Sequence, residues 1–216
     1  TKVWTKLTPN PEAVKTLLAV FPTIDAASRG VSGIIAAGII PAALELIDKT
    51  IIRAVEGWLH LGFPLDAGAV LLIELDGLRD GLDDLAERIS AVCRDNGCIS
   101  VRAAKDNAER LLLWKARKQA FGAIGRICPS FYVQDGVIPR SKLPETLAKI
   151  EKSAQKHGVI VANVFHAGDG NLHPIILFDD RDPKQIESAL ACNSEIMMTV
   201  VEAGGRSSFP RASFGV

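Results

Sequence analysis

Short apolar runs rich in β-branched residues alternate along this chain with helical patterns of about ten residues or more. Such alternation is typical of α/β and α+β domains and argues against a helix bundle or an all-β sandwich. Two successive β-α-β units in the first half, a theme that the second half repeats, predict an α+β fold of ferredoxin-like antiparallel sheet units with helices on one face. We expect strands at residues 3–7, 16–21, 42–47, 69–75, 98–101, 131–138, 159–165 and 172–178, and helices at about 25–37, 49–59, 82–95, 106–121, 141–157 and 183–203.

The charge balance excludes one large class of function. The 216 residues include 25 Lys and Arg against 25 Asp and Glu, with no basic block, whereas a nucleic-acid binder needs a basic surplus to neutralise phosphates. The longest uncharged stretch, Gly30–Leu44, is interrupted by glycine and proline and is shorter than the roughly 20 apolar residues of a transmembrane helix. The cysteines lack paired spacing, which favours reduced thiols in a cytoplasmic protein: Cys93, Cys98, Cys128 and Cys192.

The segment around Asp169 and Gly170 is the most informative one. Asp-Gly between two apolar runs predicts a two-residue hairpin turn, in which both central residues have positive φ. That turn would place His166 opposite His173, with Cβ atoms about 5 Å apart, close enough for both rings to bind one divalent metal ion. The alternative is two histidines that flank an ordinary turn and are satisfied by hydrogen bonds. A metal site also needs a third ligand, and no downstream acid is singled out among Asp179, Asp180, Glu195 and Glu202.

Three motifs make the chain recognisable. They are His166-Ala167-Gly168-Asp169-Gly170-Asn171-Leu172-His173-Pro174, Leu113-Trp114-Lys115-Ala116-Arg117 and Tyr132-Val133-Gln134-Asp135. With them the chain resembles the C-terminal half of the FAD-linked oxidases, a family that includes the FAD-linked subunit of glycolate oxidase and the D-lactate and D-2-hydroxyglutarate dehydrogenases. The resemblance implies that residues 1–10 end a missing N-terminal FAD-binding domain, that 11–205 form the cap or substrate domain, and that 206–216 are a tail that departs from the family pattern.

The resemblance also implies roles for individual residues. His166 and His173 would bind a divalent ion such as zinc or manganese, and a cation that touches the substrate hydroxyl would lower its pKa. Arg117 matches an arginine that binds the substrate carboxylate, its alternative being a solvated arginine on a basic helix face with Arg110 and Lys118. Asn171 would present its amide to substrate or flavin, or else stabilise the turn. Val133 stands where the D-2-hydroxyglutarate enzymes have a lysine, which favours a small 2-hydroxy acid with no second carboxylate.

The resemblance ends after Gly205. The family continues into a Gly-Glu-His-Gly segment, whose Glu is the third metal ligand and whose His is the usual base. This chain instead reads Arg206-Ser207-Ser208-Phe209-Pro210-Arg211-Ala212-Ser213-Phe214-Gly215-Val216, which a reading-frame change, cloning-derived sequence or a degenerate paralogue would explain. We therefore expect that this chain alone neither retains FAD nor turns over a hydroxy acid.

The leading hypothesis is the cap domain of an FAD-dependent 2-hydroxy-acid dehydrogenase of the glycolate or D-lactate type. By resemblance, the complete enzyme would pass electrons to partner subunits and the respiratory chain, as a cytoplasmic protein peripheral to the inner membrane. A second hypothesis is a non-catalytic ferredoxin-like module that binds a metabolite or assembles as a homodimer. A third, a metal hydrolase that uses His166 and His173, lacks a third ligand and a His-Glu-x-x-His helix.

Overall fold

The computed structural model describes residues 2–7 and 9–207. The strands are β1 (Ala13–Phe21), β2 (Ala43–Asp48), β3 (Ala69–Gly77), β4 (Ser100–Ala103), β5 (Ser130–Val133), β6 (Gly136–Val137), β7 (Ile160–His166), β8 (Asn171–Leu172), β9 (Pro174–Phe178) and β10 (Arg206–Ser207). The helices are α1 (Ile24–Ala36), α2 (Lys49–Leu59), α3 (Leu82–Asp95), α4 (Asn107–Lys118), α5 (Ala120–Ile124), α6 (Leu143–His157) and α7 (Pro183–Glu202). Two short 3₁₀ turns cover Arg140–Lys142 and Ala167–Asp169.

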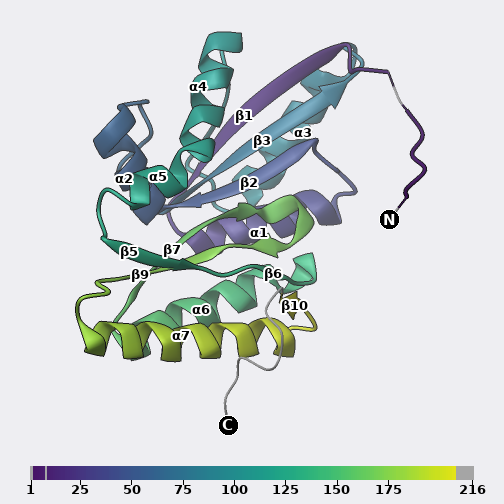
Figure 1. Ribbon diagram of the computed structural model, residues 1–216. Helices are drawn as coiled ribbons and strands as arrows, with labels where there is room; N and C mark the ends of the chain where they lie inside the picture. Colours follow the sequence, from purple (N-terminus) through teal and green to yellow (C-terminus); the bar gives the residue numbers. More distant parts are fainter. Residues whose placement is uncertain (1, 8, 208–216) are drawn as a thin grey trace.

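Over the described residues the strands form one antiparallel sheet in the order β10-β6-β8-β7-β2-β3-β1-β4, with β9 joining β7 to β5. The strands β1 to β4 lie in the order β4-β1-β3-β2, which is the ferredoxin-like arrangement, and β10-β6-β8-β7 repeats it in the second half. Figure 1 shows β1, β3 and β2 side by side. The prediction of ferredoxin-like antiparallel units is therefore confirmed. The two halves meet where β2 pairs with β7, over Glu45–His166, Leu46–Phe165 and Ile47–Val164.

Local sequence signals explain the helix boundaries. Thr23 begins α1, because its side-chain oxygen accepts a hydrogen bond from the backbone N–H of Ala26 at 3.1 Å. Asp48 caps α2 in the same way, and Pro183 occupies the first turn of α7. Gly158, with φ of 65°, ends α6 in the left-handed conformation.

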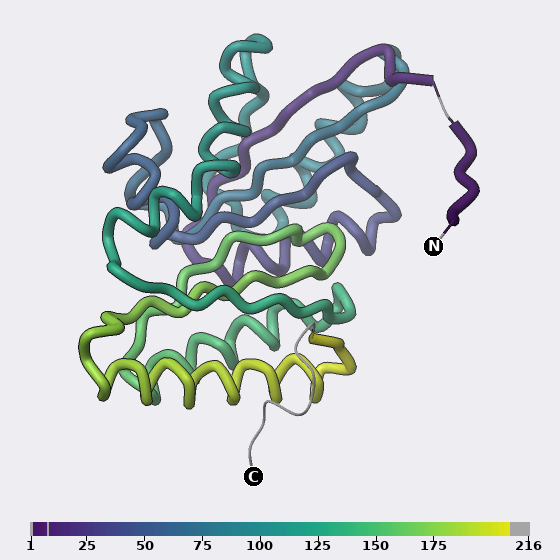
Figure 2. Tube along the Cα trace, viewed as in Figure 1, coloured from purple at the N-terminus to yellow at the C-terminus, as the bar shows by residue number. Residues whose placement is uncertain are grey.

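Helices cover both faces of the sheet, so the prediction of helices on one face is wrong. Burial on both faces explains the continuous apolar sequence of β3. On one face, Leu71 and Ile73 pack in a core with α1, α3, α6 and α7. On the other face, Val70 and Leu72 pack in a core with α2, α4 and α5. The second set of helices is added to the ferredoxin pattern: α2 lies between β2 and β3 in sequence, and α4 and α5 connect the halves, as the trace in Figure 2 shows. In Figure 1, α4 projects beyond the sheet.

Several predicted elements differ from those observed. The predicted strand 172–178 is divided into β8 and β9. Residues 3–7 form no strand and are exposed. The predicted helix 106–121 is interrupted at Gln119, which ends α4 and precedes α5, and α5 packs on α2. The predicted strand 131–138 is divided into β5, which pairs with β9, and β6, which pairs with β8 and β10.

Candidate functional site

The hairpin between β7 and β8 differs from the predicted one. His166 pairs with Asn171, so four residues connect the strands, and three of them form a 3₁₀ turn. Among these four residues only Gly170 has positive φ, at 73°, so the predicted two-residue turn is wrong. A Cβ at residue 170 would lie 2.3 Å from the backbone carbonyl oxygen of Ile138. The positive φ and this collision together restrict the position to glycine.

The two histidine rings nevertheless lie side by side. The ring centroids of His166 and His173 are 5.7 Å apart, with an angle of 81° between the planes. In the observed register Asn171 is opposite His166, and His173 is the next residue on the same face. Diagonal cross-strand neighbours of this kind are within reach of large side chains. The prediction that the rings lie close together is correct, although the predicted register that led to it is not.

A carboxylate lies at the Nδ1 atom of each ring. Oε1 of Glu45, on β2, is 2.6 Å from Nδ1 of His166, and Oδ1 of Asp135 is 3.5 Å from Nδ1 of His173. Contacts of this kind fix the orientation of an imidazole and leave Nε2 for another partner. Sequence reasoning missed Glu45, although an acid inside the apolar run of β2 is the signal that could have found it.

Arg117, on α4, contacts the same carboxylate of Glu45 that lies at His166. Its Nε donates a hydrogen bond of 2.6 Å to Oε2 of Glu45, and its side chain is only 10% exposed. The arginine is thus not on a solvated basic face, and the alternative reading of its position is wrong. The face of α4 toward the sheet carries Arg110, Leu113, Trp114 and Arg117, whereas Leu111 is 56% exposed.

A second carboxylate, that of Glu74 on β3, binds two residues of α4 that precede Arg117. It accepts two hydrogen bonds from Arg110, at 2.9 and 3.1 Å, and one from Nε1 of Trp114 at 2.6 Å. Burial raises the pKa of Glu74, but the hydrogen bonds from Arg110, Trp114 and Thr16 outweigh it and hold the pKa below its usual value. Since Glu74 contacts neither histidine, its role is to fix α4 on the sheet.

The pKa of His173 lies below its usual value. Burial is the largest cause, opposed by the negative charge of Asp135 and a backbone hydrogen bond at Gln134, and reinforced by His166 and Arg117. The neutral ring is therefore favoured at neutral pH, and a neutral ring has a nitrogen lone pair that can accept a proton or bind a metal ion.

Asn171 completes the group of sequence-based candidates. Its backbone pairs with β7 and β6, and its side-chain Oδ1 is buried without a hydrogen-bond partner within the described residues. Buried polar atoms are normally satisfied, so an unpaired one at the edge of a site favours contact with a ligand. A pocket of about 180 Å³ is lined in part by His166, Glu45 and Arg140, but Arg117, His173 and Asn171 do not line it.

The predicted metal site lacks a third ligand in the described part of the chain. His166 and His173 fit a divalent ion as two nitrogen ligands with outer carboxylates. No group of three His, Cys, Asp or Glu side chains that could hold a metal occurs in residues 2–7 and 9–207. Two of the downstream acids are engaged elsewhere: Glu195 pairs with Lys156 and His157, and Asp179 with Arg181. Residues 208–216 lie outside the described residues.

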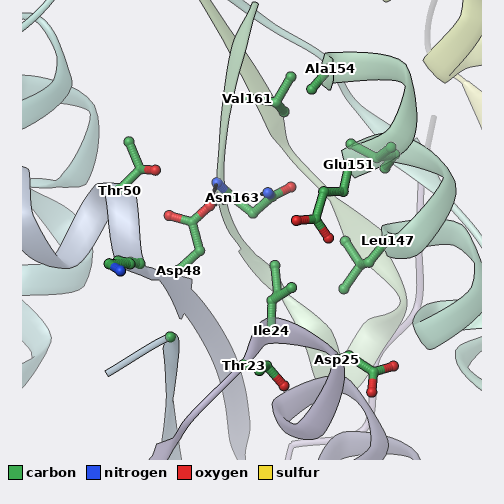
Figure 3. A pocket seen from close by; sticks show the side chains of 13 residues that line it. Thr23, Ile24, Asp25, Asp48, Thr50, Leu147, Glu151, Ala154, Val161 and Asn163 are labelled. Atoms are coloured by element: carbon green, nitrogen blue, oxygen red, sulfur yellow. Dashed lines mark hydrogen bonds between the residues drawn. The ribbon is translucent and has the colours of Figure 1, made fainter. Parts of the chain in front are cut away.

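A larger pocket, of about 520 Å³, lies on the other face of the sheet, between α1, α6 and the β2–β7 junction (Figure 3). Its buried Asp48 accepts hydrogen bonds from the backbone N–H groups of Ile51, at 3.0 Å, and Asn163, at 2.6 Å, and from the Asn163 side chain, at 3.1 Å. This carboxylate is saturated by donors that join the two halves. Its hydrogen bonds therefore stabilise the junction between the two halves of the sheet.

Comparison with known proteins defines the class. Residues 10–208 match the family "FAD linked oxidases, C-terminal domain". The chain belongs to this family, as the three motifs predicted.

Among individual relatives, the chain is 45% identical to glycolate oxidase subunit GlcD of Escherichia coli K12, covering 95% of this chain and 41% of that protein. It is 38% identical to the Bacillus subtilis subunit of the same name, covering 95% and 44%, and 26% identical to a probable mitochondrial D-lactate dehydrogenase of Danio rerio, covering 87% and 38%. The chain thus spans about two fifths of the length of these relatives. No helix among the described residues is long and apolar enough to span a bilayer.

Solved structures agree on the fold. p-Cresol methylhydroxylase with substrate bound superposes with a TM-score of 0.65 at 13% identity, over 91% of this chain and 45% of that one. 4-Ethylphenol oxidase of Gulosibacter chungangensis, in an isoeugenol complex, gives 0.63 at 17% identity, over 93% and 46%.

Proposed function

We propose that this chain is the substrate-binding cap domain of an FAD-dependent 2-hydroxy-acid dehydrogenase of the glycolate or D-lactate type. The observation that carries the proposal is the 45% identity to a glycolate oxidase subunit across 95% of the chain. The grouping of Arg117, His166, His173 and Asn171 on one face supports it independently.

The substrate carboxylate would bind to Arg117. Because Glu45 accepts from Nε, the terminal Nη1 and Nη2 groups take no part in that hydrogen bond. These two groups form a planar fork that can bind a carboxylate with two parallel hydrogen bonds. Glu45 also compensates the buried positive charge of Arg117 when no substrate is bound.

The substrate hydroxyl would face the histidine pair. Since Glu45 lies at Nδ1 of His166, Nε2 of this ring is the nitrogen free for the substrate, and the neutral ring of His173 lies beside it. The Nε2 lone pair can accept a hydrogen bond from the substrate hydroxyl or bind a metal ion, but not both at once. FAD, bound mainly by the rest of the enzyme, supplies the hydride acceptor.

A zinc or manganese ion would be held by His166 and His173. The described residues supply no third ligand, so we derive no step through a metal. The apolar Val133, where related enzymes for a dicarboxylic substrate have a lysine, supports a small hydroxy acid such as glycolate or lactate.

The remaining features of the proposal concern the complete enzyme. We propose that this chain alone does not retain FAD, and that the complete enzyme delivers electrons to partner subunits in the cytoplasm, at the inner membrane surface.

A chimera tests the proposal. The FAD-binding half of the Escherichia coli relative is joined to residues 11–205 of this chain, followed by the relative's own C-terminal segment, and dye reduction with glycolate and D-lactate is measured. We expect activity in this chimera, loss of activity in the same chimera with Arg117→Ala, and none when residues 206–216 of this chain form the end. A folded, flavin-containing chimera with the relative's end but no activity on either acid would contradict the proposal.

A further inference from the structure

Glu45 is the group that joins the two sides of the site. It lies on β2 in the first half, and its side chain is 5% exposed. One carboxylate oxygen accepts from Nε of Arg117 and the other lies at Nδ1 of His166, each at 2.6 Å. The three residues come from α4, β2 and β7, so this carboxylate connects elements that are distant in sequence.

We propose that Glu45 is a positioning residue, which fixes the tautomer of His166 and the orientation of Arg117 at the same time. This role rests on the proposed function, in which Arg117 and His166 bind the substrate. Its structural content can be tested without substrate, flavin or metal.

The tautomer follows from the chemistry of the contact. A carboxylate can only accept hydrogen bonds, so a neutral His166 must carry its proton on Nδ1. The lone pair is then on Nε2, the nitrogen that points away from Glu45. Without this acceptor the ring would be free to carry its proton on Nε2, and the lone pair would be turned away from the substrate side.

The arginine is fixed by the same group. With Nε bound to Glu45, the guanidinium plane is set relative to His166, and the Nη fork is held at a defined distance from the ring. The alternative is that Glu45 serves only to fix α4 on the sheet, as Glu74 does through Arg110 and Trp114. Glu74 therefore provides a matched control: it has the same residue type and fixes the same helix, but touches no histidine.

The experiment uses the full chain labelled with ¹⁵N in its histidines and arginines. Long-range ¹H–¹⁵N spectra, recorded at one pH where the imidazoles are neutral, report the tautomer of His166, assigned through a His166→Gln variant. We expect the Nδ1–H tautomer to predominate in the wild type and in Glu74→Ala, and the Nε2–H tautomer to predominate in Glu45→Ala. The Arg117 Nε–H resonance should change in Glu45→Ala and stay in Glu74→Ala.

The wild-type spectrum alone can overturn the proposal, since a predominant Nε2–H tautomer would contradict it. Equal changes at His166 in Glu45→Ala and Glu74→Ala would also contradict it, because they would reflect loss of helix packing. If Glu45→Ala does not fold, Glu45→Gln replaces it. Glutamine replaces one of the two accepting oxygens with an NH₂ group that cannot accept a hydrogen bond. The His166 tautomer or the Arg117 Nε–H resonance must therefore change, and an unchanged spectrum at both overturns the proposal. Failure to bind hydroxy acids would refute the proposed function but leave these results unaffected.

Discussion

Asp48 predicts an unusual pH dependence of stability. Burial raises the pKa of this carboxyl from 3.8 to about 6, although the N–H groups of Ile51 and Asn163 act in the opposite direction. A folded-state pKa above that of the unfolded chain means that the folded protein binds the proton more tightly. The contribution of Asp48 to the free energy of unfolding is therefore largest below pH 3.8 and is lost as the pH rises through about 6.

The size of the effect follows from the two pKa values. At about 1.4 kcal/mol per pKa unit, the difference corresponds to about 3 kcal/mol. That is a large part of the roughly 5–15 kcal/mol by which domains are stable. Other carboxyls oppose this trend, since hydrogen bonds from Arg181 lower the pKa of Asp179 to about 2. The effect of Asp48 must therefore be isolated by a variant.

The assay is urea unfolding of the wild type and Asp48→Asn between pH 3.5 and 7. The variant leaves one donor of Ile51 or Asn163 without an acceptor, which costs about 1–3 kcal/mol at every pH. The difference between wild type and variant should shift by about 3 kcal/mol across the range, with the wild type favoured most at the acidic end. A difference that is constant with pH would refute the assignment of a raised pKa to this buried carboxyl.

Three further predictions concern packing around the site. Glu74→Gln should lower the free energy of unfolding by about 1–3 kcal/mol, measured in urea, and should red-shift the fluorescence assigned to Trp114 by a Trp114→Phe comparison. Leu113→Ser should lower the free energy of unfolding by about 2 kcal/mol or more, because Leu113 is buried, and Leu111→Ser by less than about 0.5 kcal/mol, because Leu111 is exposed. Denaturation midpoints measure both, and the reverse order would contradict the observed orientation of α4. Gly170→Ala should cost about 1–3 kcal/mol in calorimetry, because φ is 73° and a Cβ would collide with backbone; an unchanged melting temperature would contradict this.

The sequence predicts the secondary structure of this chain well where caps and apolar runs are strong. The predicted helices 49–59 and 82–95 have the observed bounds, because Asp48 caps the first and Asn96-Gly97 follows the second. The hairpin register was predicted incorrectly, since Asp169-Gly170 can end a longer turn as well as form a two-residue one.

The site was only partly predictable for a different reason. The motifs identify Arg117, His166 and His173, but helical periodicity treats an arginine as a solvent-facing residue. Only tertiary structure shows that Glu45, 72 residues away in sequence, compensates its charge. Such pairing across distant elements leaves no local pattern.

The proposed substrate site is tested most directly by titrating the chain with glycolate and following the His166, His173 and Arg117 side-chain resonances. We predict saturable shifts at all three that vanish in Arg117→Lys, whose point charge lacks the planar fork, and persist in Arg126→Lys, an arginine over the ring of Trp58. Unchanged resonances in the wild type, or equal shifts in Arg117→Lys, would contradict a hydroxy-acid site on this face.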